Sequence, residues 1–172
     1  MKKAIFFLLA ICATWLSLPP KKAYAPARAR TQLLPGDLLF SPIGRQESRY
    51  VGHVGIVSKD GYVVHSVPSG LMKDPVDHYY RKFRVVSVYR ADESDAGQQA
   101  SAYVESLFRR FPNALYKVNT PLGTDDAVQY CTKIVWQSYY YGAGINLGRL
   151  PSKMRAVHPS LLKRKRQLKK KS

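Results

Sequence analysis

Cys131 is the residue whose type and position most directly indicate chemistry. It opens the stretch CTKIVW (residues 131–136), which predicts a helix beginning at about Tyr130. Free backbone N–H groups and the helix dipole stabilise an anion at a helix N-terminus, so a thiolate is favoured there. The same N–H groups can face the oxyanion of a tetrahedral intermediate. Cys131 is therefore a candidate nucleophile, and the alternative is a small buried apolar side chain.

Two histidines lie where they could serve such a thiol. A nucleophilic cysteine needs an imidazole, which is itself oriented by a third polar group. His53 lies in GHVGIV (residues 52–57) and His65 in YVVHS (residues 62–66), and both segments predict strands. The turn KDG (residues 59–61) between them predicts a hairpin. One histidine could then orient the other across the hairpin, and a pair of structural histidines is the alternative.

The other two histidines are predicted to be bystanders. His78 falls in a short polar segment, and His158 precedes a proline in the basic C-terminal region. Metal binding by His53, His65 and Cys131 is a chemical alternative, but the sequence lacks Cys-x-x-Cys and a tight ligand pair on a helix. We therefore expect no metal and no cofactor.

The N-terminus has the pattern of a secretory signal peptide. Two lysines precede an apolar run over residues 4–18, which is shorter than the roughly 20 residues that span a bilayer. We expect cleavage after Ala27, with an uncleaved anchor as the alternative. Cleavage removes Cys12, so Cys131 is left without a disulfide partner in an oxidising compartment, and its retention calls for a reason. The predicted location is the periplasm or the medium, with membrane association as an alternative to free diffusion.

The elements that must position these residues predict one α+β domain. Strands are expected near residues 38–40, 51–58, 62–67 and 84–90, and helices near 92–110 and 130–141. Asp74 is expected as the N-cap of a short helix with Pro75 at its first position. We expect a signal peptide over 1–27, an antiparallel sheet packed against helices over 28–150, and a basic tail over 151–172 whose end is solvated.

Four segments occur in an order that is familiar from a known family. They are PGDLLF (35–40), GHVGIV (52–57), VH (64–65) and YCTKIVW (130–136). The set resembles the circularly permuted NlpC-type papain-like cysteine hydrolases, the YiiX/YebB-like group, and the related lecithin retinol acyltransferase fold. The resemblance covers residues 33–148 and implies a permuted papain-like fold with the nucleophile at a helix N-terminus.

The resemblance also implies roles for the candidate residues. It assigns Cys131 as nucleophile, His53 as general base and acid, and His65 as the third, orienting residue. Many members of the group have an acidic third residue where this chain has His65, and often a glutamate where it has Lys133. Neither departure affects the cysteine–histidine pair, but both leave the substrate open.

The expected function is that of an exported cysteine peptidase or amidase acting through a thioester. We expect the substrate to be an amide of a peptidoglycan stem peptide, with Tyr130 lining the pocket or serving only as a half-buried aromatic. The alternatives are an amide, ester or thioester of an acyl lipid, with hydrolysis or acyl transfer, and a non-catalytic protein that coats an anionic surface.

Charge indicates further partners. There are 28 Lys and Arg against 11 Asp and Glu, a net charge of +17, which attracts polyanions. We expect the basic run over residues 163–171 to hold the protein at an anionic membrane surface or cell-wall polymer. Export argues against a specific nucleic-acid partner, and the sequence does not fix the oligomeric state.

Overall fold

The computed structural model describes residues 32–42, 52–83 and 85–171, and the expected signal peptide lies outside them. In this part of the chain, six strands form an antiparallel sheet in the order β4-β3-β2-β1-β5-β8. They are β1 (Leu38–Ser41), β2 (His53–Val57), β3 (Val63–Val67), β4 (Gly70–Asp74), β5 (Ser87–Ala91) and β8 (Leu168–Lys170). A separate parallel pair joins β6 (Leu115–Tyr116) to β7 (Val128–Gln129).

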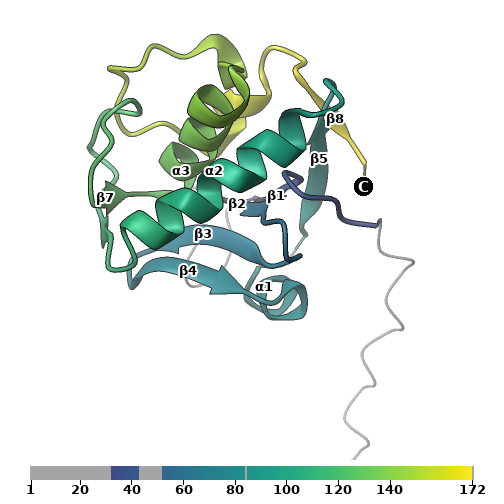
Figure 1. Cartoon of the computed structure of the whole chain (residues 1–172), viewed down its shortest axis with the longest axis horizontal. Coiled ribbons are helices and arrows are strands. Elements are labelled where there is room, and N and C mark those ends of the chain that lie inside the picture. Colours follow the sequence, from purple (N-terminus) through teal and green to yellow (C-terminus); the bar gives the residue numbers. More distant parts are fainter. Residues whose placement is uncertain (1–31, 43–51, 84, 172) are drawn as a thin grey trace, which may run out of the picture. The chain divides into compact units, whose positions relative to one another are not determined.

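Helices pack against this sheet, with α2 and α3 crossing it and α1 beside β4 (Figure 1). The helical elements are α1 (Val76–Lys82), α2 (Ala96–Arg110), α3 (Cys131–Gln137), the π-helical η2 (Ser138–Gly142) and the 3-10 turns η3 (Leu147–Arg149) and η4 (Pro159–Lys163). No helix among the described residues has the length and apolar character needed to cross a bilayer.

Two apolar cores form because side chains alternate between the faces of a strand. Ile56 and Val64 point into the larger core, which contains the buried side chains of α2 and α3. Val57 and Val63 point into a smaller core with Tyr79 of α1. The predicted α+β class, with an antiparallel sheet packed against helices, is confirmed.

The segment that follows the β2–β3 hairpin differs from the prediction. Asp74 was expected to cap a helix, but it is the last residue of β4, which pairs with β3 along its whole length. Pro75 is the N-cap of α1 and comes before the first helical residue. The change of role matters because Asp74 now lies on the sheet, on the same face as His65.

The C-terminal segment is a second correction. The prediction separated a basic tail from residue 151 onward and expected its end to be solvated. In the structure Leu162 and Leu168 are buried in the larger core. Residues 168–170 form β8, which pairs with β5 at the edge of the sheet (Figure 1). Because the leucines face inward and the lysines outward, residues 151–171 belong to the domain.

A close backbone contact fixes the start of α2 against the turn before β1. Gly36 has φ +85°, and a Cβ built on it would lie 2.2 Å from the Cα of Gly97 in the first turn of α2. Its carbonyl also accepts a hydrogen bond from the hydroxyl of Tyr139, at 2.7 Å. No side chain larger than hydrogen fits at Gly36 without separating these elements.

We expect Gly36→Ala to lower the free energy of unfolding by about 3 kcal/mol, because backbone strain and overpacking add. Gly61 is a matched control: its φ is +79°, but a Cβ there meets nothing within 4 Å. Gly61→Ala should therefore cost only about 1 kcal/mol. Urea denaturation of both variants measures the difference, and equal losses would show that the contact with Gly97 is not limiting.

Candidate active site

The sheet is interrupted between β2 and β3, and the candidate site lies at the interruption. The two strands pair only at Ile56 with Val64 and at Val57 with Val63. Along β2 the N–H groups alternate in direction, since the N–H of Val57 donates to Asp37 on the β1 side and that of Ser58 to Tyr62 on the β3 side. By this alternation the N–H of Val54 also points toward β3, beyond the end of the paired region.

The sulfur of Cys131 occupies this gap. Cys131 is the first residue of α3, is buried, and accepts a hydrogen bond from the backbone N–H of Val54. The backbone N–H groups of Cys131 and Thr132 also stabilise the sulfur. A helix N-terminus on one face of the sheet thereby reaches the strand that carries His53, which immediately precedes Val54.

His53, His65 and Asp74 form a chain of hydrogen bonds across β2, β3 and β4. Nε2 of His53 lies 3.0 Å from Nδ1 of His65, and Nε2 of His65 lies 2.8 Å from Oδ2 of Asp74. An ionised carboxylate only accepts, so His65 donates from Nε2 and its Nδ1 accepts from Nε2–H of His53. This direction leaves Nδ1 of His53 as the unprotonated nitrogen, able to take a proton.

Helix α1 and the residue after it hold this chain in place. The ring of Phe83 stacks on His53 with centroids 4.2 Å apart and planes inclined by 7°. Lys82 donates to Oδ2 of Asp74 at 2.7 Å. Tyr79 packs against both histidines, and its ring approaches within 3.0 Å of the place where a Cβ on Gly55 would be. A glycine at position 55 therefore makes room for the aromatic wall of the site.

Burial and hydrogen bonding set the protonation states of His53 and Asp74 in this hydrogen-bond chain. Burial, followed by the nearby His65 and Lys82, holds the pKa of His53 well below its ordinary value. The hydrogen bond from His65, aided by Lys82, lowers the pKa of Asp74 to about 2. Asp74 is thus ionised and His53 neutral at neutral pH, as a general base must be.

The thiol differs from the expectation of a stabilised thiolate. Burial raises the pKa of Cys131, and the hydrogen bonds from Thr132 and the N–H of Val54 only partly oppose this shift. The helix start does supply N–H groups, but enclosure of the sulfur outweighs them. The resting pair at neutral pH is therefore a neutral thiol and a neutral imidazole.

A cavity of about 30 Å³ lies beside the thiol. Tyr130 and Tyr116 line it together with Cys131. The hydroxyl of Tyr130 accepts a hydrogen bond from the N–H of Val157 at 3.3 Å, and burial raises the pKa of Tyr130 to about 12. His158, expected to be a bystander, also lines the cavity.

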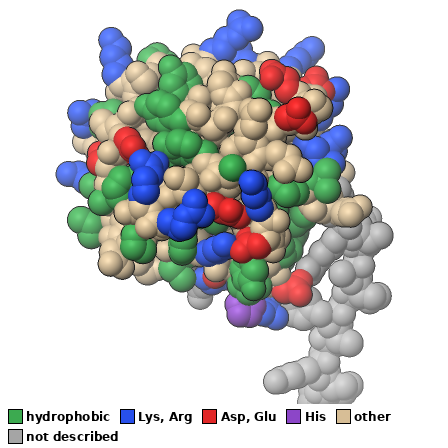
Figure 2. All heavy atoms as spheres, viewed as in Figure 1, with side chains coloured by type: hydrophobic (Ala, Val, Ile, Leu, Met, Phe, Trp, Pro, Cys, Tyr) green, Lys and Arg blue, Asp and Glu red, His purple; other side chains and the backbone are tan. Residues whose placement is uncertain are grey.

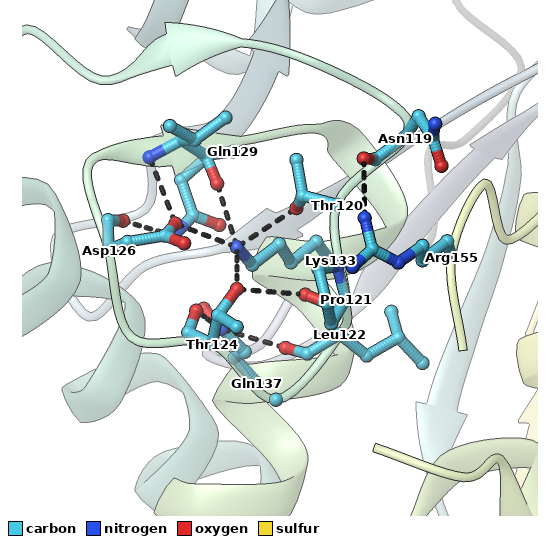
Figure 3. Close-up of polar contacts among 12 residues, drawn as sticks. Asn119, Thr120, Pro121, Leu122, Thr124, Asp126, Gln129, Lys133, Gln137 and Arg155 are labelled. Atoms are coloured by element: carbon cyan, nitrogen blue, oxygen red, sulfur yellow. Dashed lines mark hydrogen bonds and ion pairs between the residues drawn. The ribbon is translucent and has the colours of Figure 1, made fainter. Parts of the chain in front are cut away.

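Lys133 has a structural position that the sequence does not indicate. Its side chain is fully buried, and Nζ donates to Oγ1 of Thr120 (3.1 Å) and Thr124 (2.8 Å), to Oδ1 of Asp126 (2.8 Å) and to the carbonyl of Val128 (2.8 Å). Figure 3 shows this ammonium at the centre of its oxygen acceptors. Burial lowers the pKa of Lys133, and Asp126 counteracts this. Lys133 thereby ties the segment leading to β7 to the helix of the nucleophile.

The metal site considered from the sequence would use His53, His65 and Cys131 as ligands. The part of the chain that the structure describes contains no group of three or more His, Cys, Asp or Glu residues that could hold a metal ion. Nε2 of His53 and both nitrogens of His65 are already engaged in the hydrogen bonds of the chain. The oxygens around Lys133 are likewise occupied by its ammonium group.

Sequence reasoning placed Cys131, His53 and His65 in one site but missed Asp74, Lys82 and Phe83. The local pair Asp-Pro is a strong helix-start signal, which concealed β4. The turn residues Pro68 and Gly70, followed by Met72 and Asp74 at alternate positions, were the available signal for a third strand. Such a strand brings Asp74 diagonally opposite His65.

We expect Lys133→Met to lower the free energy of unfolding by about 3 kcal/mol, because four oxygens lose the buried donor. Lys153→Met, at an exposed position, is the control and should change stability by less than about 0.5 kcal/mol. Urea denaturation with unchanged m-values measures both. A loss below about 1 kcal/mol at Lys133 would show that water replaces the ammonium.

We expect the alkylation rate of Cys131 by iodoacetamide to keep rising beyond pH 8.5, about the ordinary cysteine pKa, because a raised pKa delays thiolate formation. A Cys12→Ser chain leaves Cys131 as its one thiol. The same chain in urea is the control and should titrate near the ordinary value. A rate plateau below that value in the folded protein would mean that the sulfur is already a thiolate at rest.

Comparison with known proteins agrees with this geometry. Residues 32–165 match the family described as permuted papain-like amidase enzyme, YaeF/YiiX, C92 family. The crystal structure of the metalloprotein yiiX from Escherichia coli O157:H7 is similar, with a TM-score of 0.63 and 18% identity over 83% of this chain and 98% of that chain. None of the curated proteins compared with the chain matches it. The match confirms the predicted resemblance and an enzyme of the cysteine-peptidase or amidase type, and the chain belongs to the C92 family of permuted papain-like amidases.

Proposed function

We propose that this protein is an exported cysteine amidase that hydrolyses an amide bond in peptidoglycan stem peptides. The observation that carries the proposal is the chain from Asp74 through His65 to His53, which ends one residue from the N–H group that binds the Cys131 sulfur. A nucleophile, a neutral base and an orienting acid-base pair are the components of an acyl-transfer site.

The proposed reaction begins with the neutral pair. As Sγ of Cys131 bonds to the amide carbon, Nδ1 of His53 takes the thiol proton, so no free thiolate accumulates. Backbone N–H groups at the start of α3 stabilise the oxyanion. The imidazolium of His53 is stabilised through His65 by the charge of Asp74.

Collapse of the tetrahedral intermediate breaks the C–N bond, and His53 returns the proton to the leaving amine. Water, deprotonated by the same nitrogen, then attacks the thioester. The products are a carboxylic acid and an amine, and the thiol is restored.

The family, the N-terminal sequence and the charge support the choice of location and substrate. The family is described as amidases. The sequence has the pattern of a signal peptide, and an exported enzyme would meet envelope substrates. The net charge of +17 favours approach to an anionic wall polymer or membrane surface. Lys and Arg side chains are spread around the face in Figure 2 and not confined to one patch, and Arg164 and Lys165 of the C-terminal segment are exposed.

We expect the purified protein to release new amine and carboxyl ends from soluble muropeptides, detected by mass spectrometry. Cys131→Ala should abolish turnover, His53→Ala should reduce it by at least about 10²-fold, and Asp74→Asn should reduce it less, because Asp74 acts through His65. His78→Ala changes an imidazole outside the proposed chain and is the control.

Each outcome of this assay is informative when all variants retain the circular dichroism of the native protein. Turnover that survives Cys131→Ala would overturn the proposed mechanism. Cleavage of acyl lipids with no action on muropeptides would indicate the lipid amidase or acyltransferase alternative. If neither muropeptides nor acyl lipids are cleaved, and Cys131→Ala binds isolated cell walls as the wild type does, the protein would be a non-catalytic envelope protein.

A further inference from the structure

A larger groove adjoins the cavity at the nucleophile. Its volume is about 550 Å³, which is within the range of small-ligand sites. The groove and the thiol cavity share Gly52, His158 and Pro159 as lining residues. A substrate whose carbonyl lies at Cys131 can therefore extend into the groove along this common wall.

The groove contains a cation, Lys163, that pairs with no carboxylate in the part of the chain that the structure describes. Nζ of Lys163 lies 4.7 Å from the ring centroid of Phe40 and 4.8 Å from that of Tyr89. The two rings meet edge to face at 5.2 Å, so they form a fixed corner for the ammonium. No Asp or Glu of residues 32–42, 52–83 and 85–171 forms an ion pair with Lys163. The N–H donors that do not face the rings are available to a ligand.

His158 provides a second donor at the junction of groove and cavity. Its Nδ1 accepts the backbone N–H of Ser160 at 3.2 Å and lies 2.8 Å from the hydroxyl of Ser160. Because Nδ1 accepts, the neutral ring carries its proton on Nε2. An exposed N–H therefore lies on the wall that connects Lys163 with the thiol.

The remaining lining favours a peptide over a lipid. Ser41, Ser87 and Ser160 contribute hydroxyl groups, while Phe40 and Val85 contribute apolar surface. An acyl chain would leave the ammonium of Lys163 without a charged partner, which is costly on desolvation. A short peptide has both the amides and the carboxylates that such a lining can satisfy.

We infer that this groove binds a carboxylate of the substrate peptide, with Lys163 as its counter-ion and His158 as an additional donor. The inference rests on the proposed amidase function and deepens it, since it assigns the substrate an anionic group on one side of the scissile amide. Lys163 and His158 are thus specificity-determining residues, separate from the hydrogen-bond chain that ends at Asp74.

The test measures binding without turnover, by isothermal titration of the Cys131→Ala chain. The probes are the tripeptide L-Ala-γ-D-Glu-L-Lys and the same tripeptide with both carboxyl groups amidated. We expect the carboxylate form to bind about tenfold more tightly, since charge-assisted hydrogen bonds exceed neutral ones. Adding Lys163→Met should abolish this preference, and Lys163→Arg should retain it.

Lys165→Met is the matched control, because it removes the same charge from an exposed side chain two residues away. It should leave the preference unchanged. Equal effects of Lys163→Met and Lys165→Met, or no binding of either peptide, would overturn the inference. Displacement of the peptide is also measured with phosphatidylglycerol vesicles. Binding of vesicles without binding of peptide would point to a lipid headgroup and would equally overturn it.

Hydrolysis of the tripeptide by the wild-type chain separates this inference from the proposed function. Cleavage with no carboxylate preference would retain the amidase and remove the role of the groove. Carboxylate-selective binding that depends on Lys163, without cleavage of this or any muropeptide, would retain the groove and overturn the proposed reaction.

Discussion

The hydrogen bond between the N–H of Val54 and the sulfur of Cys131 is the interaction on which the site depends. A continuous sheet would use that N–H to pair β2 with β3, and the thiol would remain on the far side of the sheet from the histidines. Because the ladder stops at Ile56 and Val64, the helix N-terminus can enter the gap. The lost pairing is replaced in part by side chains, since His53 and His65 bridge the same two strands.

Enclosure then determines how the site can react. The same burial raises the pKa of Cys131 and lowers that of His53, so both shifts disfavour a resting ion pair. Within the site, charge is confined to Asp74 and Lys82. They lie at the end of the hydrogen-bond chain that is farther from the thiol. Such a site stores no reactive thiolate, and its charge separates only when a substrate is attacked. A neutral, enclosed thiol also resists oxidation, because the thiolate is the form that oxidants attack.

Local patterns were sufficient to predict the parts of the fold whose signals are local. The β2–β3 hairpin follows from its turn, and the start of α3 follows from the apolar stretch after Tyr130. Asp74 was misplaced because a strong local cap signal competed with a strand that pairing with β3 stabilises. The sequence did not indicate that the C-terminal segment folds into the domain, because lysines dominate its composition. Burial of Leu168 depends on pairing with β5, which is distant in the sequence. Neither the early end of the β2–β3 ladder nor the acceptors of Lys133 can be read from adjacent residues.

The permuted order of the strands and α3 has a consequence during synthesis. His53, His65 and Asp74 all precede α1 and emerge from the ribosome together, whereas Cys131 follows more than fifty residues later. A nascent or prematurely terminated chain therefore has the complete proton relay but no nucleophile. In ordinary papain-like order the reactive thiol would be made first and would wait, unprotected, for its base. Here the relay precedes the thiol, so the strands that carry the base and its partners have already been made when Cys131 appears.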